Sequence, residues 1–106
     1  MTIRLYLSGP MTSQPEFNRP AFMDAETRLS ETGFLVLTPA RNVPLTDSPT
    51  WQDYMRLAIA QLATADMVAL LPGWHYSHGA RTEKMLAEAH GQTERLGKHL
   101  FGAGAV

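Results

Sequence analysis

The chain has 106 residues, no cysteine, 44% apolar residues and a net charge of −1. This length suits one domain with its own core, and the near-zero charge lacks the positive excess of proteins that bind nucleic acid polymers. The absence of cysteine excludes disulfides and thiolate catalysis. With no apolar run of 18 residues and no signal-peptide pattern, we expect a cytoplasmic protein that does not enter a membrane. Residues 1–106 then form a single domain with a mobile tail over 102–106.

The first third of the chain reads as a strand, a long loop and a helix. Residues 3–8 are rich in apolar side chains and stop at a Gly-Pro turn, which predicts a strand. The loop over residues 9–19 is long for a strand-to-helix connection, and such loops are often functional. Asn18 is placed to cap the following helix, and Gly33 to end it.

The middle of the chain repeats the alternation. Residues 34–37 form a short continuous apolar run, which predicts a strand buried on both faces. A loop over residues 40–49 follows. Thr50 and Asp53 then have the spacing of a capping box and predict the start of a second helix, which ends near residues 63–64.

The last part begins with another solid apolar run. Residues 66–71 predict a third strand, and a helix opens at Gly79 or Ala80 and reaches about residue 91. After it, residues 92–98 continue the helix or form a connector, and residues 99–101 are a candidate fourth strand.

Alternating strands and helices predict an α/β domain. Right-handed crossovers make it a doubly wound, flavodoxin-like or Rossmann-like parallel sheet of three to five strands, in the order 2-1-3, with helices on both faces. Ligands of such sheets bind at the carboxyl ends of the strands, where the strand order reverses. The loops over residues 9–19 and 72–79 should therefore converge on one crevice.

Two residues near this crevice have side chains suited to catalysis. Glu83 is placed in the first turn of the third helix, where it either interacts with the helix dipole or faces the crevice as a carboxylate nucleophile. Tyr6 is the polar-tipped residue of the first strand. Its hydroxyl either completes the core or holds Glu83 or a sugar oxygen. Ala80, Glu83 and Ala87 share one helix face.

The two loops supply candidate ligand contacts. The loop that begins Ser8, Gly9, Pro10 and Met11 offers backbone N–H groups and hydroxyls to a phosphate or sugar, but it lacks the spacing of a P-loop. Other candidates are Arg19 for an anion and Trp74, which either packs or forms a wall of the crevice. Trp51 reads as packing and Arg81 as a surface charge.

A metal site is a weaker alternative. His75 and His78 stand close together, but no further ligand lies at a recognised spacing. We therefore expect neither a metal nor a cofactor.

Two motifs of the chain occur together in a known superfamily. The pairing of YLSGPM with ADMVALLPGW and the following GARTE resembles the nucleoside 2-deoxyribosyltransferase-like superfamily, over about residues 3–91. Within this superfamily the chain more closely resembles a small branch, common in bacteria and phages, that has no assigned activity. The superfamily includes deoxyribosyltransferases and nucleotide N-glycosidases.

The resemblance implies roles for matching positions. Glu83 corresponds to the nucleophile and Tyr6 to the residue that orients it, while Gly9 lies in the substrate-binding turn. Ser77 corresponds to a ligand-contacting position. Gly79 and Ala80 match the tight turn that leads into the helix.

One position departs from the superfamily pattern. Ala58 stands where many relatives carry an aspartate that contacts the base or a sugar hydroxyl. Asp53 is a possible partial substitute, and His75 or His78 a possible proton source for the leaving base. General acid–base assistance raises the rate of such a reaction by about 10²–10⁴-fold. Without the aspartate, the sequence does not decide between weak turnover, turnover supported by another group, and none.

Two functions remain at this stage. The first is cleavage or base exchange at the N-glycosidic bond of a nucleoside or nucleoside 5′-monophosphate, through a glycosyl ester of Glu83. The second is a nucleotide-binding module without turnover. In either case an open crevice in a small domain predicts a homodimer or larger homo-oligomer.

Overall fold

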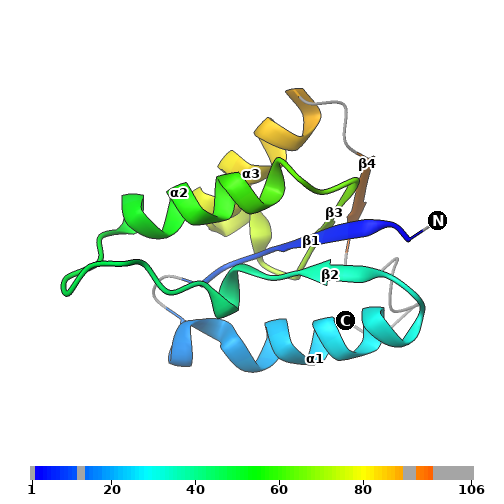
Figure 1. Ribbon diagram of the computed structural model, residues 1–106, viewed down its shortest axis with the longest axis horizontal. Coiled ribbons are helices and arrows are strands. Elements are labelled where there is room, and N and C mark those ends of the chain that lie inside the picture. Colours follow the sequence, from blue (N-terminus) through cyan, green and yellow to red (C-terminus); the bar gives the residue numbers. More distant parts are fainter. Residues whose placement is uncertain (1, 12–13, 90–92, 97–106) are drawn as a thin grey trace.

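The computed structural model describes residues 2–11, 14–89 and 93–96, which form one α/β domain (Figure 1). Four parallel strands make the sheet, in the order β2-β1-β3-β4. They are β1 (Arg4–Ser8), β2 (Leu35–Leu37), β3 (Met67–Leu70) and β4 (Thr93–Leu96). The predicted order 2-1-3 is confirmed, and the fourth strand lies beyond β3.

The fourth strand comes from an unexpected part of the chain. Residues 93–96 pair with β3 in parallel, with Met67 opposite Thr93 and Leu70 opposite Leu96. The expectation of a helix extension or connector there is wrong, because these residues satisfy the backbone groups along the open edge of β3. Residues 99–101 and the tail over 102–106 lie outside the described residues.

The helices cover both faces of the sheet, as predicted. Helix α1 (Arg19–Glu31) lies on one face, and helices α2 (Trp51–Leu62) and α3 (His78–Ala89) lie on the other (Figure 1). A short 3-10 turn lies between each of the first three strands and the helix that follows it: η1 (Pro15–Asn18), η2 (Pro39–Arg41) and η3 (Trp74–Tyr76). Within the described part of the chain, no helix is long and apolar enough to cross a membrane.

The ends of α1 follow the sequence only in part. Gly33 has a φ of 99° and follows the last turn, where the Phe34 N–H donates to the Leu29 carbonyl at 3.3 Å. This is the predicted C-terminal glycine, in a Schellman arrangement. Asn18 occupies the N-cap position, but its side chain donates to the Pro10 carbonyl at 2.9 Å and does not cap the helix.

Helix α2 starts with the predicted capping box. The Thr50 hydroxyl accepts from the Asp53 N–H at 3.2 Å, and the Asp53 carboxylate accepts from the Thr50 N–H at 2.9 Å. This reciprocal pair satisfies two N–H groups at the helix start. It also orients the first turn of α2, which forms part of the cleft described below.

Strand β2 differs from its prediction. It was expected to be buried on both faces, yet Leu35 is 50% exposed. Strand β2 pairs only with β1 among the described strands and forms an edge of the sheet. Its apolar side chains are therefore only partly covered.

The two faces of the sheet form separate cores. Leu5 and Leu7 of β1 pack with Phe22, Ala25 and Leu29 of α1. On the opposite face, Tyr6 packs with residues of both other helices, among them Ala58, Leu62 and Ala87. Successive residues of a strand point to opposite faces, so β1 contributes to both cores.

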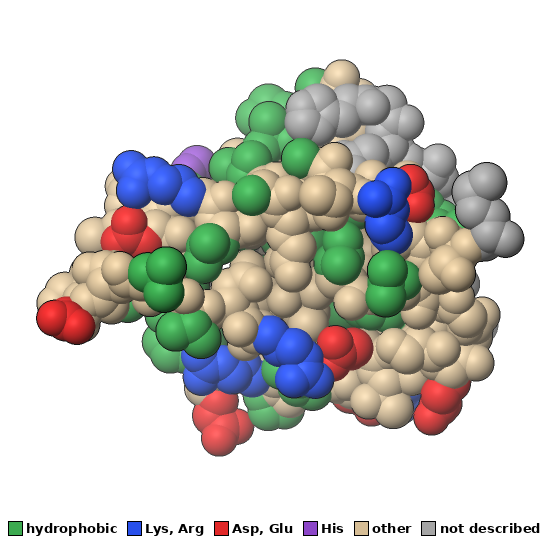
Figure 2. Space-filling view, viewed as in Figure 1, with side chains coloured by type: hydrophobic (Ala, Val, Ile, Leu, Met, Phe, Trp, Pro, Cys, Tyr) green, Lys and Arg blue, Asp and Glu red, His purple; other side chains and the backbone are tan. Residues whose placement is uncertain are grey.

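The charged side chains form pairs on the surface. Arg4 pairs with Asp66 at 3.2 Å and Arg41 with Glu26 at 2.6 Å. On the face shown in Figure 2, basic side chains stand beside acidic ones. Exposed pairs of this kind contribute at most about 1 kcal/mol each. Their mixture leaves no broad surface of one sign on this face.

Candidate functional site

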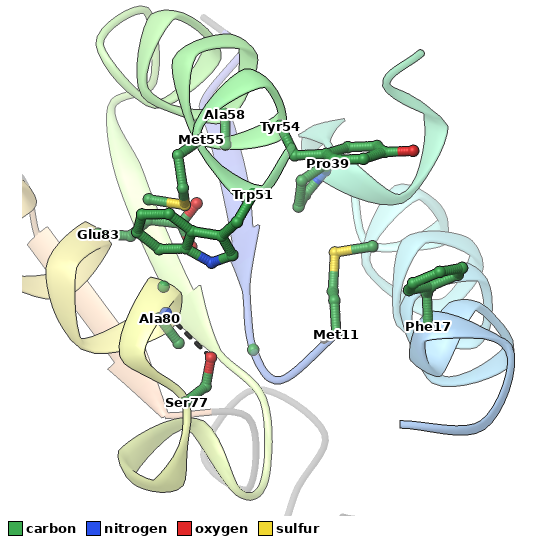
Figure 3. Close-up of a pocket in the computed structure, with 12 residues that line it drawn as sticks. Met11, Phe17, Pro39, Trp51, Tyr54, Met55, Ala58, Ser77, Ala80 and Glu83 are labelled. Atoms are coloured by element: carbon green, nitrogen blue, oxygen red, sulfur yellow. Dashed lines mark hydrogen bonds between the residues drawn. The ribbon is translucent and has the colours of Figure 1, made fainter. Parts of the chain in front are cut away.

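A cleft opens where β1 and β3 end, at the predicted switch point. Including its open mouth, it contains about 670 Å³ of atom-free space. Figure 3 shows Trp51, Met55 and Ala58 of α2 on one side, and Met11 and Phe17 on the other. The described lining residues are Gly9, Met11, Phe17, Pro39, Trp51, Tyr54, Met55, Ala58, Ser77, Gly79, Ala80 and Glu83.

Glu83 is the only charged residue among the described residues that line the cleft. Its side chain is 5% exposed, and both carboxylate oxygens accept hydrogen bonds from β1. The Tyr6 hydroxyl donates to Oε2 at 2.5 Å and the Ser8 hydroxyl donates to Oε1 at 2.6 Å. Tyr6 and Ser8 are two residues apart on the strand and therefore point to the same face.

The position of Glu83 in its helix removes one of the two sequence interpretations, the interaction with the helix dipole. Helix α3 begins at His78, so Glu83 lies in the second turn and not in the first. The helix dipole acts within the first turn, so it does not account for this carboxylate. Ala80, Glu83 and Ala87 are the buried residues of α3, on one face as predicted.

Burial controls the protonation of this group. Removal from water raises the pKa of Glu83 to about 7, against the opposing effects of the hydrogen bonds from Ser8 and Tyr6. Burial, and then the charge of Glu83, hold the pKa of Tyr6 well above 10. Near neutral pH the tyrosine therefore keeps its proton, while the carboxyl is divided between its two forms.

Two glycines allow close packing around the cleft. A Cβ atom at Gly9 would lie 2.9 Å from the Leu71 Cβ, so the turn after β1 accepts no larger residue without movement. A Cβ at Gly79 would lie 3.3 Å from the Met55 sulfur. The start of α3 thus lies against α2, and the small residues bring Glu83 close to the opposite wall.

Ser77 caps α3. Its hydroxyl oxygen accepts from the Ala80 N–H at 3.2 Å, the bond drawn in Figure 3. The hydroxyl hydrogen is directed elsewhere and can donate within the cleft. The capping role was not predicted, and the predicted ligand contact stays a prediction.

Four predicted ligand contacts, Ser8, Pro10, Arg19 and Trp74, lie away from the described lining. Ser8 is fully buried, and its hydroxyl donates to Glu83. The Pro10 carbonyl accepts from Asn18, and the Arg19 guanidinium lies 5.2 Å from the centre of the Phe17 ring. Trp74 packs against the core beneath α2 and α3, with the Lys84 ammonium 5.6 Å from its ring centre. Trp51, and not Trp74, provides the tryptophan wall of the cleft.

Sequence reasoning missed most of the apolar lining. Trp51 reads as packing from the sequence, because helical periodicity identifies an apolar face but not what it covers. Phe17 carried no signal at all. It lies in a run of three residues with positive φ, Glu16, Phe17 and Asn18, at 53°, 55° and 60°. Such a run is uncommon outside glycine and turns Phe17 into the cleft.

The candidates for a second acid lie outside the cleft. Ala58 lines the cleft and is 3% exposed. Asp53 is engaged by Thr50 and, at 3.1 Å, by Arg56. His78 stacks on Trp51 with ring centres 5.1 Å apart, and neither it nor His75 is among the described lining residues. No three His, Asp or Glu side chains of the described chain gather as metal ligands would.

Comparison with known proteins identifies a family whose function is not described. The model of a family described as a domain of unknown function (DUF4406) matches residues 3–93. No curated protein matches the chain. The matched range includes both sides of the cleft.

Proposed function

Because the chain belongs to the DUF4406 family, a domain of unknown function, we propose its activity from the chemistry of the cleft. The activity is cleavage or base exchange at the N-glycosidic bond of a nucleoside or nucleoside 5′-monophosphate. The observation that carries the proposal is the buried Glu83 carboxylate, which lines a small-molecule cleft and is held by hydroxyls on both oxygens.

The reaction uses Glu83 as a nucleophile. In its ionised form, a carboxylate oxygen attacks C1′ as the bond from C1′ to the base breaks, and the bonding electron pair leaves with the base. The product is a glycosyl ester of Glu83, formed through an oxocarbenium-like transition state. Water, or the nitrogen of a second base, then displaces the carboxylate from C1′.

Tyr6 and Ser8 prepare the carboxylate for this step. Their hydrogen bonds lower the pKa of Glu83 and so oppose the effect of its burial. A carboxylate has about four acceptor positions, and the two hydroxyls occupy two of them. One lone pair on each oxygen remains for attack, while the side chain is held in place.

The sequence motifs support the same chemistry. The motifs resemble those of the nucleoside 2-deoxyribosyltransferase-like superfamily, and by that resemblance Tyr6 and Glu83 match its orienting and nucleophilic residues. A 5′-phosphate on the ligand would be contacted from the loop that carries Phe17, with Arg19 as the proposed basic partner. Replacement of Arg19 should then weaken the binding of 5′-monophosphates more than the binding of nucleosides.

A second candidate function is ligand binding without turnover. Ala58 favours it, because no acid on α2 faces the cleft to protonate a departing base. Under this alternative the ligand is the same class of compound. Binding then raises the melting temperature of the protein with no release of base.

Replacement of Glu83 tests the proposal. Glu83→Gln should lower base release from a panel of nucleosides and 5′-monophosphates by roughly 10³-fold or more, because it removes the nucleophile. Glu88→Gln is the matched control, since Glu88 lies on the same helix, 57% exposed and paired with Lys84. Release is measured by chromatography of the free base. Release that survives Glu83→Gln contradicts the mechanism, and ligand-dependent stabilisation without release selects the binding module.

A further inference from the structure

Few of the described side chains that line the cleft can transfer a proton. Glu83 is the single ionisable acid or base of ordinary strength among its described lining residues. The remaining polar groups there are the Ser77 and Tyr54 hydroxyls and the Trp51 indole N–H. These are weak acids and are poor proton donors at neutral pH.

This composition creates a difficulty for neutral bases. A neutral purine or pyrimidine leaves with an extra electron pair and needs a proton, and a positioned acid contributes about 10²–10⁴-fold to such a step. Glu83 cannot supply that proton and attack C1′ as a carboxylate in the same step. Asp53 is held outside the cleft by Thr50 and Arg56.

We propose that the cleft takes a nucleoside or nucleotide whose base is a permanently cationic heterocycle, such as a pyridinium or an N7-alkylated purine. This inference rests on the proposed function and names its substrate class. It follows from the pairing of one buried carboxylate with a lining that offers no second acid among the described residues.

The reaction balances without a proton donor. A Glu83 oxygen forms a bond to C1′ as the C1′–N bond breaks. The electron pair of that bond stays on the ring nitrogen, which changes from positive to neutral, and the heterocycle departs unprotonated. Water then attacks C1′, the electron pair of the ester bond returns to the Glu83 carboxylate, and the water proton passes to solvent.

The walls of the cleft suit a flat cation. Trp51, Tyr54 and Phe17 line it and are 37%, 39% and 51% exposed. Figure 3 shows Phe17 facing the cleft from one side, with Trp51 and Tyr54 across from it. Aromatic faces attract cations, and a nearby carboxylate in an apolar setting adds to this attraction. Burial that raises the pKa of Glu83 to about 7 would be partly offset by a bound cation.

Matched substrates test the proposal directly. Guanosine and 7-methylguanosine differ by one methyl group and one positive charge at pH 6, and nicotinamide riboside provides a pyridinium. Rates are corrected for the uncatalysed reaction and for the Glu83→Gln blank. We expect base release from the two cations to be at least about 10²-fold faster than from guanosine. This ratio is the lower end of the rate contribution that a positioned acid makes to the departure of a neutral base.

Binding provides a second readout that is independent of turnover. Titration calorimetry should show tighter binding of 7-methylguanosine than of guanosine to the wild type, and Glu83→Gln should reduce this preference to the part that the aromatic walls provide. Equal affinities in the wild type, or a preference of unchanged size in Glu83→Gln, overturn the proposal. A Glu83-dependent preference without release supports the ligand class and overturns the proposed turnover. If guanosine is cleaved as fast as the two cations and this cleavage depends on Glu83, the proposed turnover is supported and the cationic substrate class is overturned.

Restoring an acid tests the cause of the preference. Ala58→Asp places a carboxyl group on the lining of the cleft and should raise the ratio of the guanosine rate to the 7-methylguanosine rate at least about 10-fold. A folded variant with an unchanged ratio overturns the explanation. If the variant fails to fold, the wild-type substrate pair decides the question alone.

Discussion

The two faces of the sheet differ in what β1 presents to them. Toward α1 the strand presents Leu5 and Leu7, both fully buried in an apolar core. Toward α2 and α3 it presents Tyr6 and Ser8, whose hydroxyls hold the Glu83 carboxylate. One face thus provides stability through apolar burial, and the other includes a buried charge that costs stability. Four consecutive residues of β1, 5–8, serve both purposes because their side chains alternate.

The largest stability effect is expected on the α1 face. Leu7→Ala removes a fully buried side chain and should lower the free energy of unfolding by about 2–5 kcal/mol. Urea unfolding followed by circular dichroism measures it. The Glu83-dependent change of stability with pH should persist in this variant, and its loss would contradict the independence of the two faces.

The α2 and α3 face should respond to pH. The folded-state pKa of Glu83 is about 7 against an ordinary value of 4.5, so the folded chain binds the Glu83 proton more tightly than the unfolded chain. Stability should therefore fall as pH rises from about 4.5 to about 7, by roughly 3 kcal/mol from this group.

Comparison with Glu83→Gln isolates that contribution. The pKa values of Asp53 and Asp66 are lowered by hydrogen bonds from Thr50 and Arg4, so those groups act in the opposite direction at lower pH. They are present in both proteins and cancel in the difference. Parallel stability curves for the wild type and Glu83→Gln between pH 4.5 and 8 would contradict a buried, proton-binding Glu83.

A smaller effect is expected from the Tyr6 hydroxyl, which holds the proposed nucleophile Glu83. Tyr6→Phe removes a hydrogen bond that lowers the pKa of Glu83, so this pKa should rise. The half-maximal pH of base release should move upward, with a rate loss of about 10- to 100-fold at pH 7. Tyr76→Phe, at an 83% exposed position, is the control. A lower rate with an unshifted pH profile would show that Tyr6 acts in another way.

The outer surfaces of the helices extend the comparison. No large apolar side chain of α1 is strongly exposed, whereas α2 exposes Leu57 and Ile59, and the cleft residues Trp51 and Tyr54, by 37–39% each. We propose that a second copy of the chain covers the side of α2 that carries Leu57, three residues after Tyr54 and next to the mouth of the cleft. Sedimentation at micromolar concentration should show a dimer, and Leu57→Asp a monomer. A monomeric wild type would remove the proposal.

Much of the fold follows from local patterns in the sequence. Apolar runs, the Gly33 stop and the capping box at Thr50 each indicate an element from a few neighbouring residues. Alternating strands and helices then restrict the topology, because parallel strands need right-handed crossovers. Strand β4 escaped this reasoning, since residues 93–96 have little strand character of their own and pair with an available edge.

The cleft shows where local patterns end. Tyr6 and Glu83 were identifiable as candidates from the strand and the Gly-containing turn before the helix. Both Tyr6 and Ser8 donate to Glu83, which lies 77 and 75 residues away in the sequence. These contacts depend on the register of β1 against β3 and on the position of α3 against the sheet. Trp51, and not the predicted Trp74, forms a wall of the cleft, and this also depends on how α2 packs. The sequence by itself determined most of the elements and singled out Glu83 as a candidate, because these depend on short-range chemistry. Only tertiary packing decided its partners and its protonation, because burial and long-range contacts arise when the elements meet.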